Sequence, residues 1–453
     1  MKRWKSCVGG FVIVGSCLAC SDGGGGAADS GVTAEAGAPV DAATPPKDAA
    51  PADVATDAPA APPPSHVMTA DYWLSSSIAS SCAKVAPYLT YIYPKSGEYG
   101  TYHACGIKTV AYMTPSMPQT GEIEYSLIGN AYADVRAKDC KGNVVTTYAG
   151  QGYLMDPHAT DALAFYQATI DATFAEIEKG SGIEPDAIFS DNSDEDYGAS
   201  ATPCTWTSFG DWTKATTAIL AKLDTHGAQL FLNDLSLPEA YSVIPAGDTV
   251  QNVIDSLAPA PVTGGEQEGF VYDLITHPDR WTMEVDTEIA AVAAHKVYWA
   301  YSNHSLANVD PTSAGGIAIR NYLYASFLLG YEPAHAIFQE WFNGTPSGFK
   351  VMPETGLVPM QPLQTAKSDV GELQRGAGGP FVREFASCYF RGVLVGPCAA
   401  VVNPSSQSVA VDLPAYAASV GLSGSDILDG GNVGFAGPKI TTLGPEQAAI
   451  LLP

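Results

Sequence analysis

The sequence is poor in basic residues, and this scarcity limits the partners that the protein can have. It contains 22 Lys and Arg against 48 Asp and Glu, a formal net charge of −26. Residues 66–453 alone carry 41 acidic and 18 basic side chains, a net of −23. Such a surface repels nucleic acid and anionic polymers, whereas it tolerates neutral or cationic partners. We therefore expect no nucleic-acid partner.

Several motifs are also absent, and each absence removes a class of function. No glycine-rich phosphate loop follows the first predicted strand, which disfavours an open, doubly wound nucleotide-binding sheet. No G-x-S-x-G sequence occurs, which disfavours a Ser-His-Asp hydrolase. Residues 66–453 contain neither a CxxC pair nor Cys/His metal spacing, which argues against a zinc site. We expect neither a cofactor nor a bound metal.

The N-terminus has the pattern of an export signal. Basic residues at the start precede a short apolar run, which is too short to span a membrane. The sequences "VGSC" and "CLAC" both resemble the lipobox of bacterial lipoproteins, and they end at Cys17 and Cys20. We predict a signal peptide over residues 1–20 and lipidation of Cys20; Cys17, or simple secretion with cleavage nearby, are the alternatives. Ser21 is compatible with sorting to the outer membrane.

Residues 21–65 have the composition of a tether. They are rich in Ala, Pro, Gly and Asp and contain almost no large apolar side chain, so they cannot bury enough surface to offset chain entropy. We predict a disordered linker that holds the following domain away from the cell envelope. The lipid would be the only membrane contact, and we expect a monomer.

Six cysteines follow the linker, and an even number in an exported chain indicates three disulfides. Cys388 and Cys398 flank a turn in "CYFRGVLVGPC" and can join neighbouring strands. We pair Cys82 with Cys105 and Cys140 with Cys204, although the sequence alone does not fix these connections.

Short apolar strands alternate with helical stretches over residues 66–374. The helix candidates have apolar residues at helical spacing, as in "TDALAFYQATIDATFAEIEKG". Strands that are apolar on both faces and separated by helices indicate a parallel sheet, and eight of them fit a (β/α)8 TIM barrel. The predicted strands are 88–93, 108–113, 152–156, 186–191, 229–234, 260–266, 296–302 and 335–341.

From residue 375 the pattern changes to period-two alternation, with turns at Arg391-Gly392 and Asn403-Pro404. This pattern predicts a small antiparallel β-sandwich over residues 375–453. A structural role is expected for it, and carbohydrate binding is the alternative.

Polar residues stand at the ends of the predicted strands, where a TIM barrel carries its active site. They are Asp156, Asp191, Asn233, Asp234, Glu266, Glu268, Ser302, Asn303 and Glu340. Aromatic residues that could stack on sugar rings lie nearby, namely Tyr112, Trp206, Trp212, Tyr272, Trp299 and Trp341, although Trp299 and Trp341 could equally be core residues.

The acidic segment "SDNSDED" after the fourth predicted strand has three interpretations. An EF-hand is excluded because Gly and Glu are missing from the required positions, but a looser cation site remains possible. For Asp194, Glu195 and Asp196 we favour a solvated loop. For Asp191 we favour function, because it is the last residue of its strand.

Glu266 and Glu268 follow strand 6, across the barrel mouth from Asp191. Two carboxyl groups in this arrangement are what glycoside hydrolysis requires: one attacks or activates water, and the other protonates the leaving oxygen. The glycines of "GGEQEGF" permit a ligand to approach closely, although an inert turn could have the same composition.

The segments "YLMDPHATDALAFYQATIDATFAEIEKGSGIEPDAIFSDN", "EGF" and "VVNPSSQSVAVDLP … AAILLP" resemble (β/α)8 glycoside hydrolases, and among these the hypothetical glycosyl hydrolase family fifteen. The resemblance implies that Asp191 is the strand-4 acid and Glu268 the strand-6 acid, with Glu266 as the alternative. It also implies that Asp156 contacts a sugar hydroxyl. Ser190 and Ala187 depart from the family pattern inside the strand.

Taken together, the sequence predicts a surface-tethered glycoside hydrolase acting on a neutral or amino-sugar polysaccharide. Asp191, Glu268 and Glu266 are the candidate catalytic residues. The candidate substrate-binding residues are Asp156, Tyr112, Asn233, Asp234, Tyr272, Asn303, Glu340 and Trp206. The alternatives are a carbohydrate-binding lipoprotein on a barrel without catalysis, and a purely structural lipoprotein.

Overall fold

A computed structural model of the 453-residue chain provides the fold. It describes residues 64–72, 82–95, 97–191, 199–233, 235, 250–271, 278–302, 310–339, 352–366, 368–421 and 434–453. One compact unit spans Ala61–Pro453. The predicted signal peptide, Cys20 and the linker up to residue 63 lie outside the described residues. Among the helices within these ranges, none is long and apolar enough to cross a membrane.

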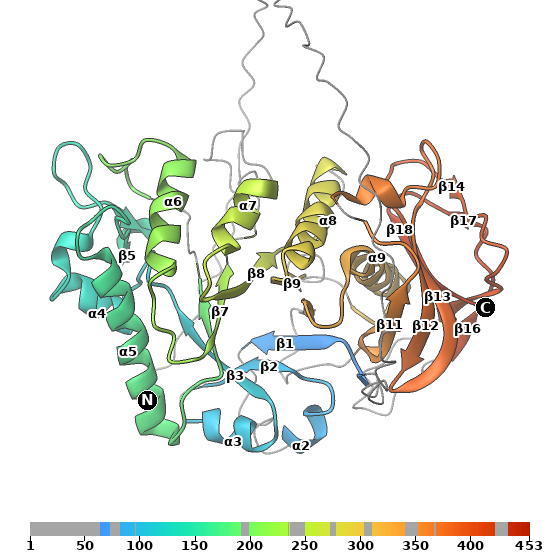
Figure 1. Cartoon of the computed structure of the whole chain (residues 1–453), viewed down its shortest axis with the longest axis horizontal. Coiled ribbons are helices and arrows are strands. Elements are labelled where there is room, and N and C mark those ends of the chain that lie inside the picture. Colours follow the sequence, from blue (N-terminus) through green and yellow to red (C-terminus); the bar gives the residue numbers. More distant parts are fainter. Residues whose placement is uncertain are drawn as a thin grey trace, which may run out of the picture. The chain divides into compact units, whose positions relative to one another are not determined.

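Eight parallel strands close into a barrel in the order β1-β10-β9-β8-β7-β6-β3-β2, with helices on its outside (Figure 1). The predicted (β/α)8 barrel is therefore confirmed. Its strands are β1 (Met68–Tyr72), β2 (Tyr91–Tyr93), β3 (Lys108–Met113), β6 (Ala187–Ser190), β7 (Gln229–Asn233), β8 (Val262–Glu268), β9 (Val297–Tyr301) and β10 (Ala336–Gln339).

One predicted barrel strand is wrong, and one barrel strand was missed. Residues 152–156 contribute only β5 (Gly152–Tyr153), which pairs with β4 (Thr146–Thr147) in a separate two-stranded sheet. The barrel is completed instead by β1, which pairs with β2 on one side and β10 on the other. The barrel gains β1 at its start and loses the predicted third strand at residues 152–156. The later strands therefore keep their positions, and β6, β7 and β8 are strands 4, 5 and 6 of the barrel.

Local signals explain where the major helices begin and end. Ser208 and Ser313 accept hydrogen bonds from the backbone N–H groups of Asp211 and Gly316, which caps two helices at their first turns. Gly182 ends another in the left-handed conformation. The helices are α2 (Cys82–Val85), α3 (Tyr99–Ala104), α4 (Ile123–Gly129), α5 (Ala162–Ser181), α6 (Phe209–Leu220), α7 (Val250–Leu257), α8 (Pro278–Ala293) and α9 (Ala314–Gly330).

The barrel interior is filled by aromatic side chains. Phe189, Phe231 and Trp299 belong to one buried cluster with Tyr91 and Tyr93 of β2. Trp299 is fully buried, and its indole N–H donates to Gln339 Oε1 at 2.9 Å. Trp299 is thus a core residue, which was the alternative to a sugar-stacking role. These large rings fill the barrel interior just below the carboxyl ends of the strands and form an aromatic floor there.

The C-terminal part forms an antiparallel sheet in the order β11-β12-β13-β18-β15-β16, together with a small sheet of β14 and β17. The predicted antiparallel domain is therefore confirmed. A second buried cluster, including Val401, Val409 and Leu451, joins the two sheets. The strands are β11 (Leu357–Pro362), β12 (Phe381–Phe390), β13 (Val393–Asn403), β14 (Val409–Ala410), β15 (Ala418–Gly421), β16 (Gly434–Gly437), β17 (Thr442–Leu443) and β18 (Gln447–Leu452).

Three disulfides join the cysteines of the barrel and the sheet. They pair Cys82 with Cys105, Cys140 with Cys204, and Cys388 with Cys398. All three predicted connections are confirmed. The second joins the long segment between β3 and α5 to the loop before α6, so it links two loops that lie near the carboxyl ends of the strands.

A buried ion pair connects the last barrel helix to the start of the C-terminal sheet. Arg320 of α9 donates to Glu354 through Nε at 2.7 Å, and both side chains are fully buried. Glu354 lies in a short 3-10 helix (Pro353–Gly356) directly before β11. The C-terminal sheet lies against α9, where β18 and β13 contact the helix (Figure 1).

We expect Glu354→Gln to lower the free energy of unfolding by about 3–5 kcal/mol, because it leaves the Arg320 charge buried without its partner. Urea denaturation measures this loss. The matched control is Arg375→Gln, which breaks the Arg375–Glu384 pair, whose arginine is 47% exposed. Exposed pairs contribute about 1 kcal/mol or less. Equal losses in the two variants would contradict the structural role of the buried pair.

Candidate active site

The carboxyl ends of strands 4, 5 and 6 bring three polar side chains together. Asp191 directly follows β6, Asn233 ends β7 and Glu268 ends β8. Phe189 and Phe231 lie in the barrel interior, and side chains two residues further along a strand point to the same side. Asp191 and Asn233 therefore lie above this aromatic floor, on the inside of the barrel mouth.

The side-chain amide of Asn233 joins the two carboxyl groups. Its Nδ2 donates to Asp191 Oδ1 at 2.7 Å and to Glu268 Oε2 at 3.0 Å. Because one nitrogen reaches both oxygens, their separation cannot exceed the sum of these lengths. A planar amide directs its two protons about 120° apart, which places the two acceptor oxygens about 5 Å from each other. The predicted residues Asp191, Asn233 and Glu268 thus form one cluster.

Tyr112 of β3 completes the environment of Asp191. Its hydroxyl group donates to Asp191 Oδ2, so each oxygen of this carboxylate accepts a hydrogen bond from a barrel residue. Two donors from different strands fix the plane of the carboxylate. The predicted site residue Tyr112 therefore contacts Asp191 directly, although its predicted role was to contact substrate.

Glu266 occupies a different position from Glu268. It lies two residues earlier on β8, in register with Trp299, and it is 1% exposed. Glu268 lies in register with Tyr301 and is partly exposed. Gly264 precedes both glutamates, and a side chain at this position would collide with the backbone of Val297. Glu268 is the glutamate that shares Asn233 with Asp191.

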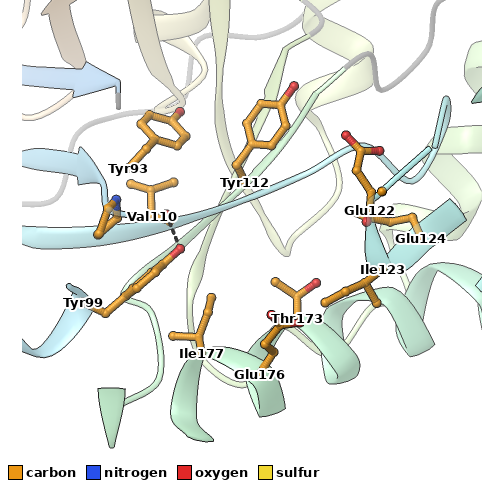
Figure 2. A pocket seen from close by; sticks show the side chains of 12 residues that line it. Tyr93, Tyr99, Val110, Tyr112, Glu122, Ile123, Glu124, Thr173, Glu176 and Ile177 are labelled. Carbon is orange, nitrogen blue, oxygen red and sulfur yellow. Dashed lines mark hydrogen bonds between the residues drawn. The ribbon is translucent and has the colours of Figure 1, made fainter. Parts of the chain in front are cut away.

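Glu122 is a candidate functional residue that the sequence analysis missed. It lies in the loop between β3 and α4, and its Oε2 accepts hydrogen bonds from Thr114 Oγ1 and the Gln119 backbone N–H, both at 2.6 Å. Figure 2 shows its carboxyl group on the same side of β3 as the Tyr112 hydroxyl. Burial raises the pKa of Glu122 to about 7, and the nearby charges of Glu124 and Asp191 act in the same direction.

Ionisation of Glu122 is expected to weaken the fold as pH rises. The folded protein keeps this proton between pH 4.5 and about 7, where the unfolded chain has released it, so the stabilisation is lost as pH rises through this window. Glu122→Gln removes the titration and should reduce the difference in unfolding free energy between pH 5 and pH 8 by on the order of 1 kcal/mol.

Urea denaturation at the two pH values measures this difference. Glu178→Gln, at an exposed position of α5, is the matched control and should leave it unchanged. If the two variants had the same pH dependence of stability, Glu122 would not carry the titration.

Asp156 does not lie at the end of a barrel strand, which corrects its predicted position. It is buried in the long segment between β3 and α5, where it accepts hydrogen bonds from the His158 backbone N–H and from Thr205 Oγ1, both at 2.9 Å. The side chain of His158 also lies between Asp156 and Asp211, at 3.3 and 3.1 Å. These contacts give Asp156 a part in holding the loops together.

Trp206 is half-buried, with its ring 5.1 Å from that of Trp212. Both rings belong to a small apolar cluster under the loops, so Trp206 packs against other apolar side chains there.

The predicted residues Asp234, Tyr272, Asn303 and Glu340 lie outside the described residues, as do residues 192–198 of the acidic loop. Within the described ranges, no group of three or more His, Cys, Asp or Glu side chains could hold a metal ion.

Comparison with known proteins finds similarity only to solved structures, and at low sequence identity. No family model and no curated protein matches the chain. Among solved structures, it is similar to the glycoside hydrolase domain of PelA from Pseudomonas aeruginosa, with a TM-score of 0.33 and 14% identity over 52% of this chain and 83% of that one. We therefore argue function from the residues of the barrel mouth.

Two further similarities extend over most of the chain. The α-glucosyl transfer enzyme XgtA has a TM-score of 0.45 and 10% identity, covering 86% of this chain and 98% of that one. The maltogenic α-amylase AmyB from Thermotoga neapolitana has a TM-score of 0.41 and 7% identity, covering 85% and 98%.

Proposed function

We propose that this protein is a glycoside hydrolase with Asp191 and Glu268 as its catalytic carboxyl groups. The observation that carries the proposal is the shared hydrogen bonding of both groups to Asn233. Two carboxyl groups that face each other at a barrel mouth provide the nucleophile and the acid that cleavage of a glycosidic bond requires.

The short separation of the two carboxyl groups supports a retaining mechanism. Inverting enzymes need about 6.5–9.5 Å between the groups, because a water molecule must fit between one of them and the sugar. The bonds of 2.7 and 3.0 Å to Asn233 limit the distance between the two nearest oxygens, Asp191 Oδ1 and Glu268 Oε2, to less than this range. A separation of about 5 Å leaves room for direct attack by a carboxylate on the sugar.

In this mechanism Asp191 is the nucleophile. Its carboxylate attacks the anomeric carbon while the Glu268 carboxyl group transfers its proton to the leaving oxygen, and a covalent glycosyl ester forms. Glu268, now ionised, removes a proton from a water molecule that attacks the same carbon, and Asp191 leaves as the carboxylate. Tyr112 and Asn233 hold Asp191 in the orientation that this attack needs.

The substrate that we propose is a neutral or amino-sugar polysaccharide, because a net charge of −23 over residues 66–453 opposes the approach of an anionic polymer. We further propose that lipidation of Cys20 holds a monomeric enzyme at the bacterial cell envelope, at the end of a linker over residues 21–65.

Incubation with a panel of neutral and amino-sugar polysaccharides tests the proposal. We expect reducing ends to be released, and proton NMR at early times should show a product with the same anomeric configuration as the substrate. Retention of a glycan without release would instead identify a carbohydrate-binding protein. Release with inversion would contradict the assignment of Asp191 as nucleophile.

A further inference from the structure

A cavity of about 370 Å³ lies beside Tyr112, the residue whose hydroxyl group donates to Asp191, and neither Asp191 nor Glu268 lines it. Its lining includes Tyr93, Tyr112 and Glu122, together with Thr173 and Ile177 of α5 (Figure 2). This volume lies within the range of small-molecule sites, which combine apolar and aromatic walls with a few polar groups. Nothing in the proposed mechanism makes use of this cavity.

Tyr112 connects the cavity to the catalytic centre. Its ring lines the cavity and its hydroxyl group donates to Asp191, so a molecule in the cavity would lie one side chain away from the nucleophile. Phe189 stacks on the Tyr112 ring at 6.0 Å, and Tyr93 packs against it edge-on at 6.5 Å. This packing gives the cavity a rigid aromatic wall.

Glu122 provides the polar group of the cavity. Both of its hydrogen bonds, from Thr114 and Gln119, go to Oε2. Among the described residues, no group bonds to Oε1, and the side chain is only partly buried. The two hydrogen bonds to Oε2 hold the carboxyl group in place, and Oε1 can then accept hydrogen bonds from the hydroxyl groups of a ligand.

We propose that this cavity is a subsite for one uncharged sugar ring of the substrate, next to the bond that is cleaved. Glu122 would hydrogen-bond to the hydroxyl groups of that ring, and its C–H surface would pack on Tyr112. The inference rests on the proposed glycoside hydrolase activity and extends it by assigning one uncharged sugar ring to a particular cavity.

Charge selects the class of sugar. Glu124 and Glu176 also line the cavity, and Asp191 lies behind Tyr112. Glu124 is buried and accepts a hydrogen bond from the Thr114 backbone N–H, and burial raises its pKa, so the negative charge near the cavity comes chiefly from Glu176 and Asp191. A uronic acid would place a negative charge among these carboxyl groups, and like charges at short range repel each other. The subsite should therefore reject uronates.

Calorimetric titration tests the subsite in Asp191→Asn protein, in which catalysis is blocked. The probes are neutral tetrasaccharides of glucose, galactose and mannose, with tetragalacturonate as the anionic counterpart. Adding Glu122→Ala should weaken the best neutral tetrasaccharide by up to about 10-fold, the upper end of the usual contribution of one hydrogen bond. Adding Glu122→Gln should weaken it less, because the amide keeps an acceptor for Thr114 and Gln119. Tetragalacturonate should bind at least about 10-fold more weakly than the neutral ligand.

Kinetics of Glu122→Ala with Asp191 intact distinguish a subsite from an effect on catalysis. We expect the loss of kcat/KM to be about 10-fold larger for the tetrasaccharide than for the 4-nitrophenyl monoglycoside of the same sugar. Equal losses for both substrates, unchanged tetrasaccharide affinity, or preference for tetragalacturonate would each overturn the inference. If the unmodified protein cleaves a neutral glycan, these results refute the subsite alone. If it neither cleaves nor binds any glycan, the proposed function and the subsite fail together.

Discussion

Replacing Asp191 by asparagine is expected to lower kcat by about 10⁴-fold or more, the scale of loss when a nucleophile is removed. The amide cannot form the covalent ester, so both steps of the retaining mechanism are blocked. The change is nearly isosteric, and the amide oxygen can still accept the hydrogen bond from Asn233 or Tyr112. Release of reducing ends measures the loss, and the urea midpoint should stay close to that of the unmodified protein.

A small nucleophile should restore part of this activity. In Asp191→Ala, azide can occupy the space of the lost carboxylate and attack the anomeric carbon directly. The product would be a glycosyl azide whose configuration is inverted relative to the substrate. If Asp191→Asn kept full activity, or if azide had no effect on Asp191→Ala, Asp191 would not be the nucleophile.

Glu268→Ala is expected to have the second-largest effect, a loss of about 10²–10⁴-fold on natural glycans, the range that a general acid contributes. Such glycans have poor leaving groups, which require a proton from Glu268. Glycosyl fluorides need little protonation, so their first step should be nearly unaffected. A comparison of kcat/KM for the two classes of substrate measures this dependence on the leaving group.

The matched control for Glu268 is Glu266→Ala, because Glu266 lies two residues earlier on the same strand and is buried. Azide separates the two roles further. In Glu268→Ala it should attack the glycosyl ester on Asp191 and give an azide of retained configuration, opposite to the product of Asp191→Ala. A leaving-group dependence in Glu266→Ala but not in Glu268→Ala would transfer the acid role to Glu266.

The sequence predicted most of the barrel because parallel strands bury both faces and therefore contain apolar runs. It did not predict β1, which alternates apolar Met68 and Ala70 with polar Thr69 and Asp71. The strand assigned to residues 152–156 was wrong for a related reason. Leu154 is apolar because it packs into the small cluster under the loops, and Met155 because it packs into the main core that also contains residues of the strands and helices. Apolar runs indicate burial but not the partner against which a segment is buried.

The sequence identified some residues of the candidate active site and missed others, depending on whether they lie at the ends of barrel strands. Asp191, Asn233 and Glu268 were found because side chains at the carboxyl ends of neighbouring strands 4, 5 and 6 must converge at a barrel mouth. Glu122 lies nine residues beyond the end of β3, and only the path of the following loop brings it back to the mouth. No periodic pattern in the sequence predicts the course of that loop. Asp156 was included in the predicted site because its segment was taken for a barrel strand and because the family resemblance pointed to it.

Trapping the covalent intermediate tests the central claim most directly. The protein would be incubated with a panel of 2-deoxy-2-fluoro glycosyl fluorides, which slow breakdown of a glycosyl ester, and its intact mass would be measured before and after. We predict a gain of one fluoroglycosyl group, located on Asp191 by peptide mapping and absent from Asp191→Asn. Hydrolysis of glycans with inversion and no adduct, or an adduct on another residue, would contradict the retaining mechanism with Asp191 as its nucleophile.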